Sequence, residues 1–186
     1  MEKHKWNFAD TITASRIIVS VSLIFLSLEE IVFYILYAIA GGMDALDGFV
    51  ARKTDSVSSF GARFDSLADL IFCAIIFSRI LPLLFYSLPA KLWIIVGIIV
   101  FIRLVSYIFA GIKYRRFAAL HTIMNKLTGF ALFLLPFFIR YSVTAVYFFV
   151  MCGLALVAAV EELLIHICRT EYNPNVKSLF FARERR

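Results

Sequence analysis

The chain has 186 residues, of which 62% are hydrophobic and 17% are charged. This composition is far more apolar than that of soluble domains, so it excludes an ordinary soluble enzyme or binding module and predicts an integral membrane protein. The formal net charge of +6 comes from lysines and arginines that lie mainly between apolar segments, and we expect no nucleic-acid partner.

The N-terminal residues ahead of the first apolar segment are basic and aromatic. Lys3, Lys5, Trp6 and Phe8 suit either a short interfacial segment on anionic lipid headgroups or the ordinary anchoring of a spanning helix. Because no small-residue cleavage site follows the first apolar run, we expect that run to remain as a span.

Six apolar segments follow, and most approach the length that a helix needs to cross a bilayer. In chain order they cover residues 12–28, 31–43, 64–84, 92–110, 123–139 and 143–168. The second is short, so we expect its helix to continue into the polar stretch that follows and to break at Gly48. The pattern predicts an all-α membrane bundle of six transmembrane helices with an N-terminal interfacial segment, in a single domain over residues 1–186.

Lysine and arginine are distributed unevenly between the two sides of this bundle. If both termini are cytoplasmic, only Arg79, Lys91 and Arg140 lie outside, and the first outside turn is acidic at Glu29 and Glu30. This asymmetry follows the positive-inside rule. It predicts a multi-pass protein of the cytoplasmic membrane, with both termini and the polar stretch after residue 43 on the cytoplasmic side.

That polar stretch gathers four carboxylates at the membrane boundary: Asp44, Asp47, Asp65 and Asp69. Ionised carboxylates repel one another where water is scarce, unless cations neutralise them. Asp44 and Asp47 are three residues apart and Asp65 and Asp69 are four apart, so in helices each pair would share one face. The spacing predicts a site at which two helix ends hold divalent metal ions.

Residues between the carboxylates are suited to a phosphorylated ligand. Two metal ions on carboxylates can clamp a pyrophosphate. Gly48 and Gly61 allow close approach, Ala51 keeps the same wall low, and Arg52 offers a planar fork for phosphate oxygens. The alternative is that the glycines only allow the helices to pack, as small residues do in membranes.

The whole run, residues 44–69, resembles the signature of the CDP-alcohol phosphatidyltransferase family. The signature reads Asp, two residues, Asp-Gly, two residues, Ala-Arg, eight residues, Gly, three residues, Asp, three residues, Asp, and every fixed position is present. The resemblance implies a magnesium- or manganese-dependent transferase, with two ions, that takes CDP-diacylglycerol as donor and releases CMP. It also implies a homodimer.

The resemblance assigns roles to these positions. Asp44, Asp47, Asp65 and Asp69 would be metal ligands, and Asp69 would also be the general base that takes the proton from the acceptor hydroxyl. A fourth metal ligand without proton transfer is the alternative for Asp69. The donor nucleotide would be held by Asp47, Gly48, Ala51, Arg52 and Gly61.

A phosphorylated acceptor alcohol needs cations outside the motif. Those that can face the cytoplasmic cavity are Arg16, Arg103, Lys113, Arg115, Arg116, His121 and Lys126. We select Arg16, Arg103, Arg116 and Lys126 as candidates for the acceptor phosphate. For Arg115 and Arg116, a solvated basic loop is the alternative.

Arg103 lies well inside an apolar segment, where a charge marks a functional site or a buried partner. The alternative reading pairs it with Glu161 or Glu162 in the last span, and the same acids could instead pair with Arg16.

Thr13 and Arg16 resemble the Thr, two residues, Arg pattern near the start of phosphatidylglycerophosphate synthases, and Lys126 is similar to a basic position of family members with phosphorylated acceptors. The chain departs from the usual Pro-Asn lead-in, since residues 7–10 read Asn-Phe-Ala-Asp. We therefore expect glycerol 3-phosphate as the acceptor, with serine or an inositol phosphate as the runner-up.

Two other classes also use membrane carboxylates. A polyprenyl-transferring enzyme normally has more spans and another Asp spacing, and a small cation transporter is expected to show paired repeats or broken helices near the midplane.

The three cysteines, Cys73, Cys152 and Cys168, have no metal-like spacing, and we expect them to be buried small apolar residues.

Overall fold

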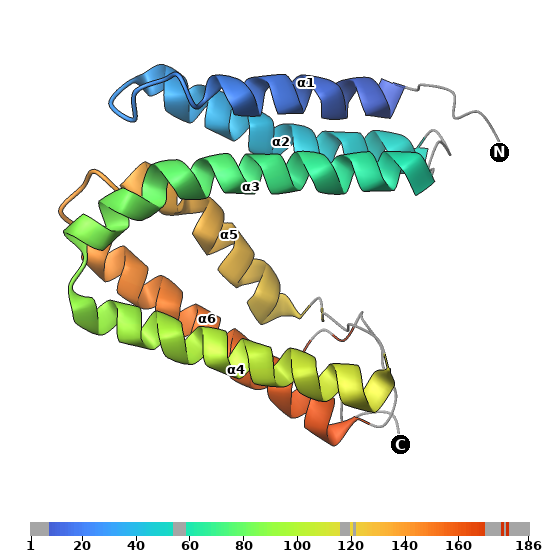
Figure 1. Cartoon of the computed structure of the whole chain (residues 1–186), viewed down its shortest axis with the longest axis vertical. Helices are drawn as coiled ribbons and strands as arrows, with labels where there is room; N and C mark the ends of the chain where they lie inside the picture. Colours follow the sequence, from blue (N-terminus) through green and yellow to red (C-terminus); the bar gives the residue numbers. More distant parts are fainter. Residues whose placement is uncertain are drawn as a thin grey trace. The chain divides into compact units, whose positions relative to one another are not determined.

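The computed structural model describes the backbone of residues 8–53, 59–115, 120, 122–169, 176 and 178, and their side chains except those of residues 8–9, 44–45, 47–53, 59 and 62. The helices, drawn in Figure 1, are α1 (Phe8–Ser22), α2 (Ile31–Lys53), α3 (Ser59–Ser87), α4 (Ala90–Tyr114), α5 (Ile123–Phe138) and α6 (Thr144–Cys168). No strand occurs in this part of the chain. The predicted all-α class with six helices is confirmed.

Length and apolar composition identify the helices that can cross a membrane. Arg63–Ser87 in α3, Ala90–Tyr114 in α4 and Thr144–Cys168 in α6 each reach 25 residues, and Ile31–Met43 and Ile123–Phe138 are shorter apolar helices. Many large apolar side chains on these helices are exposed, among them Phe101 at 67% and Phe130 at 61%. Lipid can cover such surfaces, since its tails are as apolar as these side chains. The chain is therefore a membrane helix bundle.

The first helix differs from the expected span of residues 12–28. α1 begins at Phe8 and ends at Ser22. Beyond it, the N–H groups of residues 23–25 donate to carbonyl groups three residues earlier at 3.1 to 3.2 Å, which tightens the chain into turns. The Ser22 hydroxyl donates to the Val19 carbonyl at 2.7 Å, and such local bonds compete with continued α-helix.

Chain contacts define two compact units, Met1–Phe85 and Tyr86–Arg186. The expectation of a single domain over the whole chain remains a prediction. The two units are described separately below.

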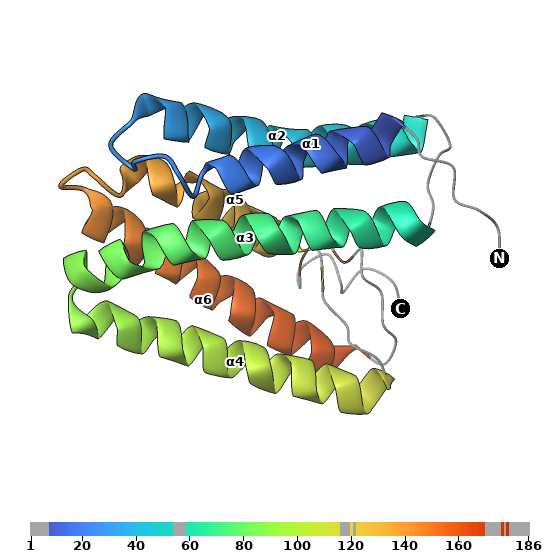
Figure 2. The ribbon, with the colours of Figure 1, turned by 45° about the horizontal axis from the view of Figure 1, so that its top comes forward.

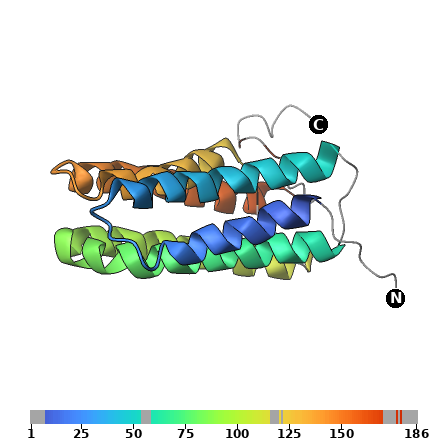
Figure 3. The same ribbon diagram turned by 90° about the horizontal axis from the view of Figure 1, so that it is seen from above.

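In the N-terminal unit, α1 packs against α2, and the turn between them reverses the chain (Figures 2 and 3). Tyr37 of α2 stacks on Phe72 of α3, with ring centroids 5.5 Å apart. At the end of α1, Nη2 of Arg79 in α3 donates to the Leu26 carbonyl at 2.6 Å. Ring stacking and this hydrogen bond thus join α3 to α2 and to the turn after α1.

In the C-terminal unit, α6 packs against both α4 and α5. Trp93 of α4 contacts Phe148 of α6 at 5.9 Å between ring centroids, and Phe138 at the end of α5 stacks on Tyr147 of α6 at 4.4 Å. The Tyr147 hydroxyl also donates to the Ala131 carbonyl at 2.6 Å. A half-buried tyrosine of this kind adds a hydrogen bond to its apolar contact.

Candidate functional site

The motif residues lie on the end of α2 and the beginning of α3. α2 continues through Gly48 to Lys53, so the expected helix break at Gly48 is wrong. A glycine inside a helix costs only about 1 kcal/mol relative to alanine, and the neighbours of Gly48 are residues that helices accommodate. Asp44 and Asp47 therefore lie on helical backbone, as expected, whereas their side chains are outside the described part of the chain.

Asp65 and Asp69 lie one turn apart on α3 and share one cationic partner from α1. Nη2 of Arg16 donates to Asp65 Oδ1 at 2.7 Å and to the Asp65 carbonyl at 3.1 Å. The same nitrogen lies 3.3 Å from Asp69 Oδ1. The Arg16 guanidinium therefore joins two of the predicted metal ligands. The alternative pairing of Arg16 with the acids of α6 stays a prediction.

Burial differs sharply between the partners. The Arg16 side chain is 1% exposed, whereas those of Asp65 and Asp69 are 40% and 53% exposed. The guanidinium thus approaches the carboxylates from the protein interior, and part of each carboxylate remains open on the other side. An open carboxylate face can accept a further cation.

The donor atoms at this position fit a hard divalent metal. Magnesium and manganese prefer carboxylate oxygens, and magnesium sites commonly use only one or two protein carboxylates together with ligand phosphates. Asp65 and Asp69 supply such oxygens with open faces. Within the described residues no group of three or more His, Cys, Asp and Glu side chains is close enough to hold a metal. The side chains of Asp44 and Asp47 lie outside the described part of the chain.

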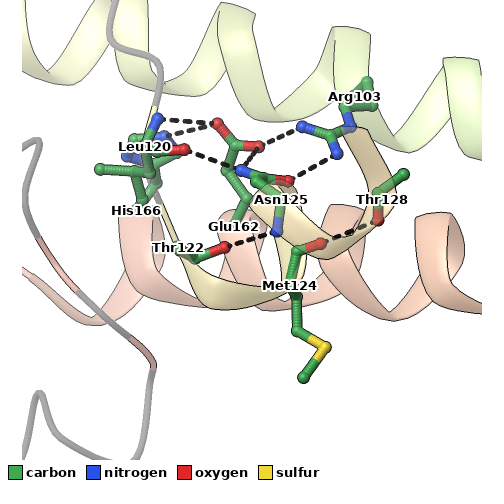
Figure 4. A network of polar contacts seen from close by, with 8 residues as sticks. All are labelled: Arg103, Leu120, Thr122, Met124, Asn125, Thr128, Glu162 and His166. Carbon is green, nitrogen blue, oxygen red and sulfur yellow. Dashed lines mark hydrogen bonds and ion pairs between the residues drawn. The ribbon is translucent and has the colours of Figure 1, made fainter. Parts of the chain in front are cut away.

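A second polar cluster lies in the C-terminal unit, around Glu162 of α6 (Figure 4). Glu162 Oε2 accepts from Arg103 Nη1 at 2.5 Å and from Asn125 Nδ2 at 3.1 Å. Arg103 Nη2 in turn donates to Asn125 Oδ1 at 2.7 Å. The predicted alternative for Arg103, a buried salt bridge with an acid of the last span, is confirmed for Glu162.

The same network holds the chain where it enters α5. Asn125 Nδ2 donates to the Leu120 carbonyl at 2.8 Å, and the Leu120 N–H donates to Glu162 Oε1 at 3.3 Å. Thr122 caps α5, because its hydroxyl accepts from the Asn125 N–H at 3.1 Å. Glu162 is 0% exposed, and its buried charge is matched by the Arg103 guanidinium and by N–H donors of Asn125 and Leu120.

Asn125 was not singled out from the sequence. The sequence signal that could have indicated it is its position three residues after Thr122, because a polar residue at this distance from a capping residue is typical of helix N-termini. Its role in joining Arg103 to Glu162 depends on helix packing and has no local sequence signature. The other acid, Glu161, accepts instead from the Ser178 hydroxyl at 2.7 Å.

The remaining acceptor candidates are dispersed. Lys126 is exposed on α5, and Arg115 is exposed at the end of α4. Nζ of Lys113 donates to the His166 and Ile167 carbonyls at 2.7 and 3.1 Å, near the end of α6, where a cation stabilises the helix. Arg116 and His121 lie outside the described residues, so their roles remain predictions.

The cysteines differ in part from the expectation that all three are buried. Cys152 is buried, whereas Cys73 and Cys168 are exposed. Cys73 lies on α3 and Cys168 ends α6. Lipid tolerates a small apolar thiol on a helix surface, so burial in protein is not required.

The described helices and their exposed apolar side chains define a helical membrane protein. The CDP-alcohol phosphatidyltransferase family matches residues 6–163, and the chain belongs to this family. Members of this family use a CDP-linked alcohol donor and an alcohol acceptor within a membrane, and they are generally dependent on divalent metal.

One curated relative shares a short segment with the chain. It is a CDP-diacylglycerol--serine O-phosphatidyltransferase of Methanocaldococcus jannaschii, 61% identical over 28 residues. The match covers 15% of this chain and 14% of the relative, so the chain spans only a small part of that protein's length. No solved structure matches the chain.

Proposed function

We propose that the protein transfers the phosphatidyl group of CDP-diacylglycerol to glycerol 3-phosphate and releases CMP. The observation that carries the proposal is the complete family signature over residues 44–69, whose last two acids, Asp65 and Asp69, lie with open carboxylate faces beside a buried arginine. The same family assignment favours an enzyme over a cation transporter or a polyprenyl-transferring enzyme.

Asp44, Asp47, Asp65 and Asp69 would hold two divalent ions, Mg²⁺ or Mn²⁺. When bound, these ions neutralise charge on the pyrophosphate and on the departing CMP. Gly48, Ala51, Arg52 and Gly61, together with Asp47, would hold the nucleotide of the donor.

In this reaction the acceptor oxygen forms a bond to the phosphorus that carries the diacylglycerol. The bond from that phosphorus to the oxygen of CMP breaks, and CMP leaves with the bonding electrons. Asp69 takes the proton of the acceptor hydroxyl, as a positioned carboxylate can when it is within hydrogen-bond reach. Its exposure of 53% leaves room for a substrate hydroxyl.

A phosphorylated acceptor is supported by Arg16, a buried cation directly beside Asp65 and Asp69. Arg103, Arg116 and Lys126 are further candidates for the acceptor phosphate. For Arg103 this role competes with its ion pair to Glu162, and for Arg16 it competes with the ion pairs to Asp65 and Asp69. A guanidinium suits a phosphate because its N–H groups match the oxygen geometry.

Serine is the second candidate acceptor, and the specific observation in its favour is the identity shared with the archaeal serine enzyme. An inositol phosphate is a third. Serine carries no phosphate, so Arg16→Gln should spare serine transfer far more than transfer to a phosphorylated acceptor. This contrast separates the candidates.

The decisive experiment measures CMP release from CDP-diacylglycerol by the purified protein. Mg²⁺ and Mn²⁺ are tested in turn, each with glycerol 3-phosphate, serine or inositol phosphate as the sole acceptor, and EDTA removes the metal. Release with glycerol 3-phosphate alone, lost with EDTA, supports the proposal. Release with serine alone replaces the acceptor, and no release by folded protein that fails to bind the donor contradicts the reaction itself.

We place the protein in the cytoplasmic membrane with its active site and both termini on the cytoplasmic side, and we propose a homodimer. The charge asymmetry of the loops supports the orientation. An Arg140→Cys variant in sealed vesicles tests the orientation. A thiol reagent that cannot cross the membrane should label this cysteine only from the outside. Light scattering of the detergent-purified protein tests the dimer.

A further inference from the structure

The position of Arg16 has a consequence for metal binding. Its guanidinium lies 2.7 Å from Asp65 Oδ1 and 3.3 Å from Asp69 Oδ1, and the side chain is 1% exposed. Burial on α1 and the additional hydrogen bond to the Asp65 carbonyl, at 3.1 Å, hold the positive charge against these carboxylates. A divalent ion that binds them must do so with this charge close by.

Two opposite effects are possible in such an arrangement. A cation beside two carboxylates can fix their orientation and so prepare them for a metal. It also neutralises part of their charge and repels an incoming cation, and in a partly desolvated site this repulsion is stronger than in water. The geometry favours repulsion, because Arg16 Nη2 lies against Oδ1 of both carboxylates. A metal ion at the open face of these acids therefore has the guanidinium charge directly behind them.

We infer that Arg16 is an internal counter-charge that competes with divalent metal at Asp65 and Asp69, so that the site without substrate binds metal weakly. The inference rests on the proposed function, because it takes both acids as metal ligands. In that setting the pyrophosphate of the donor restores the missing negative charge. Metal then binds strongly only together with the donor, and the empty site is kept intact without metal.

The test is Mn²⁺ binding to the detergent-purified full chain without nucleotide, followed by the spectroscopic signal of free Mn²⁺. Arg16→Gln removes the charge, and Arg16→Lys keeps it. Arg79→Gln is the matched control, since Arg79 belongs to the same unit but donates to the Leu26 carbonyl at 2.6 Å. We expect Mn²⁺ to bind Arg16→Gln about tenfold more tightly than wild type, because a buried charge interacts more strongly than an exposed one. Arg16→Lys and Arg79→Gln should stay within about twofold of wild type.

Thermal unfolding supplies an independent measure. Without metal, Arg16→Gln should unfold at a lower temperature than wild type, because the carboxylates lose their counter-charge. Saturating Mn²⁺ should raise its unfolding temperature by more than it raises that of wild type, because ligand binding stabilises according to affinity. If Arg16→Gln folds only when purified with Mn²⁺, that result also supports the inference, and failure to fold under both conditions, shared by Arg16→Met, overturns it.

Equal or weaker Mn²⁺ binding by Arg16→Gln overturns the inference and shows instead that Arg16 positions the carboxylates. Absence of Mn²⁺ binding by every variant at millimolar concentration also overturns it. CMP release by wild type is measured separately. Tighter Mn²⁺ binding by Arg16→Gln without CMP release keeps the counter-charge and removes the proposed reaction, whereas CMP release with unchanged Mn²⁺ affinity does the reverse.

Discussion

Arg16 of α1 and Asp65 of α3 form an ion pair of 2.7 Å across a sequence separation of 49 residues. The pair joins the first helix of the N-terminal unit to the helix that carries the end of the family signature. It therefore links the stability of the unit to the charge state of the candidate site.

The two carboxylates should contribute unequally to stability when metal is absent. Asp65 accepts from Arg16 at 2.7 Å, whereas Asp69 Oδ1 is 3.3 Å away. We expect Asp65→Asn to lower the free energy of unfolding by about 1–2 kcal/mol and Asp69→Asn by less than half as much, since short charge-assisted hydrogen bonds are the stronger ones. Thermal unfolding in detergent with EDTA measures the difference. Equal losses would show that the shorter contact has no special weight.

Activity should show the opposite order of sensitivity. Asp69→Asn removes the proposed base and should lower kcat by about 100-fold to 10,000-fold, the range of general base catalysis. Binding of CDP-diacylglycerol should persist, because the donor is held mainly by other residues. The control is Glu29→Gln, which also replaces a carboxylate by its amide, at an exposed position in the turn before α2. Retention of more than a tenth of kcat in Asp69→Asn would leave Asp69 as a metal ligand at most.

The network of the C-terminal unit should be important for stability. Glu162 is 0% exposed and its carboxylate binds Arg103, Asn125 and the Leu120 N–H. Glu162→Gln leaves the Arg103 guanidinium without its counter-charge, and we expect a loss of about 3 kcal/mol.

Its matched control is Glu161→Gln, one residue earlier on the same helix, where the carboxylate accepts from Ser178. We expect a loss below about 1 kcal/mol there, because that side chain is only half-buried and water can replace part of what the carboxylate loses. Thermal unfolding of both variants makes the comparison. Similar midpoints for the two variants would contradict the assigned importance of the Arg103 pair.

Gly97 of α4 offers a test of whether small residues are needed for packing. A Cβ atom added there meets none of the described heavy atoms within 4 Å. Gly97→Ala should therefore be tolerated and should raise stability by about 0.5–1 kcal/mol through helix propensity. A lower unfolding midpoint, or a change of oligomeric state in light scattering, would instead indicate that another copy of the chain packs on this position.

Much of the architecture followed from local patterns. Apolar segments and their lengths predicted the six helices and most of their ends within a few residues, because lipid requires each span to satisfy its own backbone hydrogen bonds. The end of α1 at Ser22 and the continuation of α2 through Gly48 were not predicted. Both depend on small local preferences, such as serine hydroxyl bonding and the modest cost of a helical glycine.

The sequence by itself determined the class of the protein, since the signature of residues 44–69 and the apolar segments are contained in short stretches of chain. Only the tertiary structure decided which charges meet. Arg16 pairs with Asp65 and Asp69, and Arg103 pairs with Glu162 across 59 residues. The physical reason is that a spacing of three or four residues fixes which side chains share a helix face, whereas an ion pair between helices depends on how the faces pack.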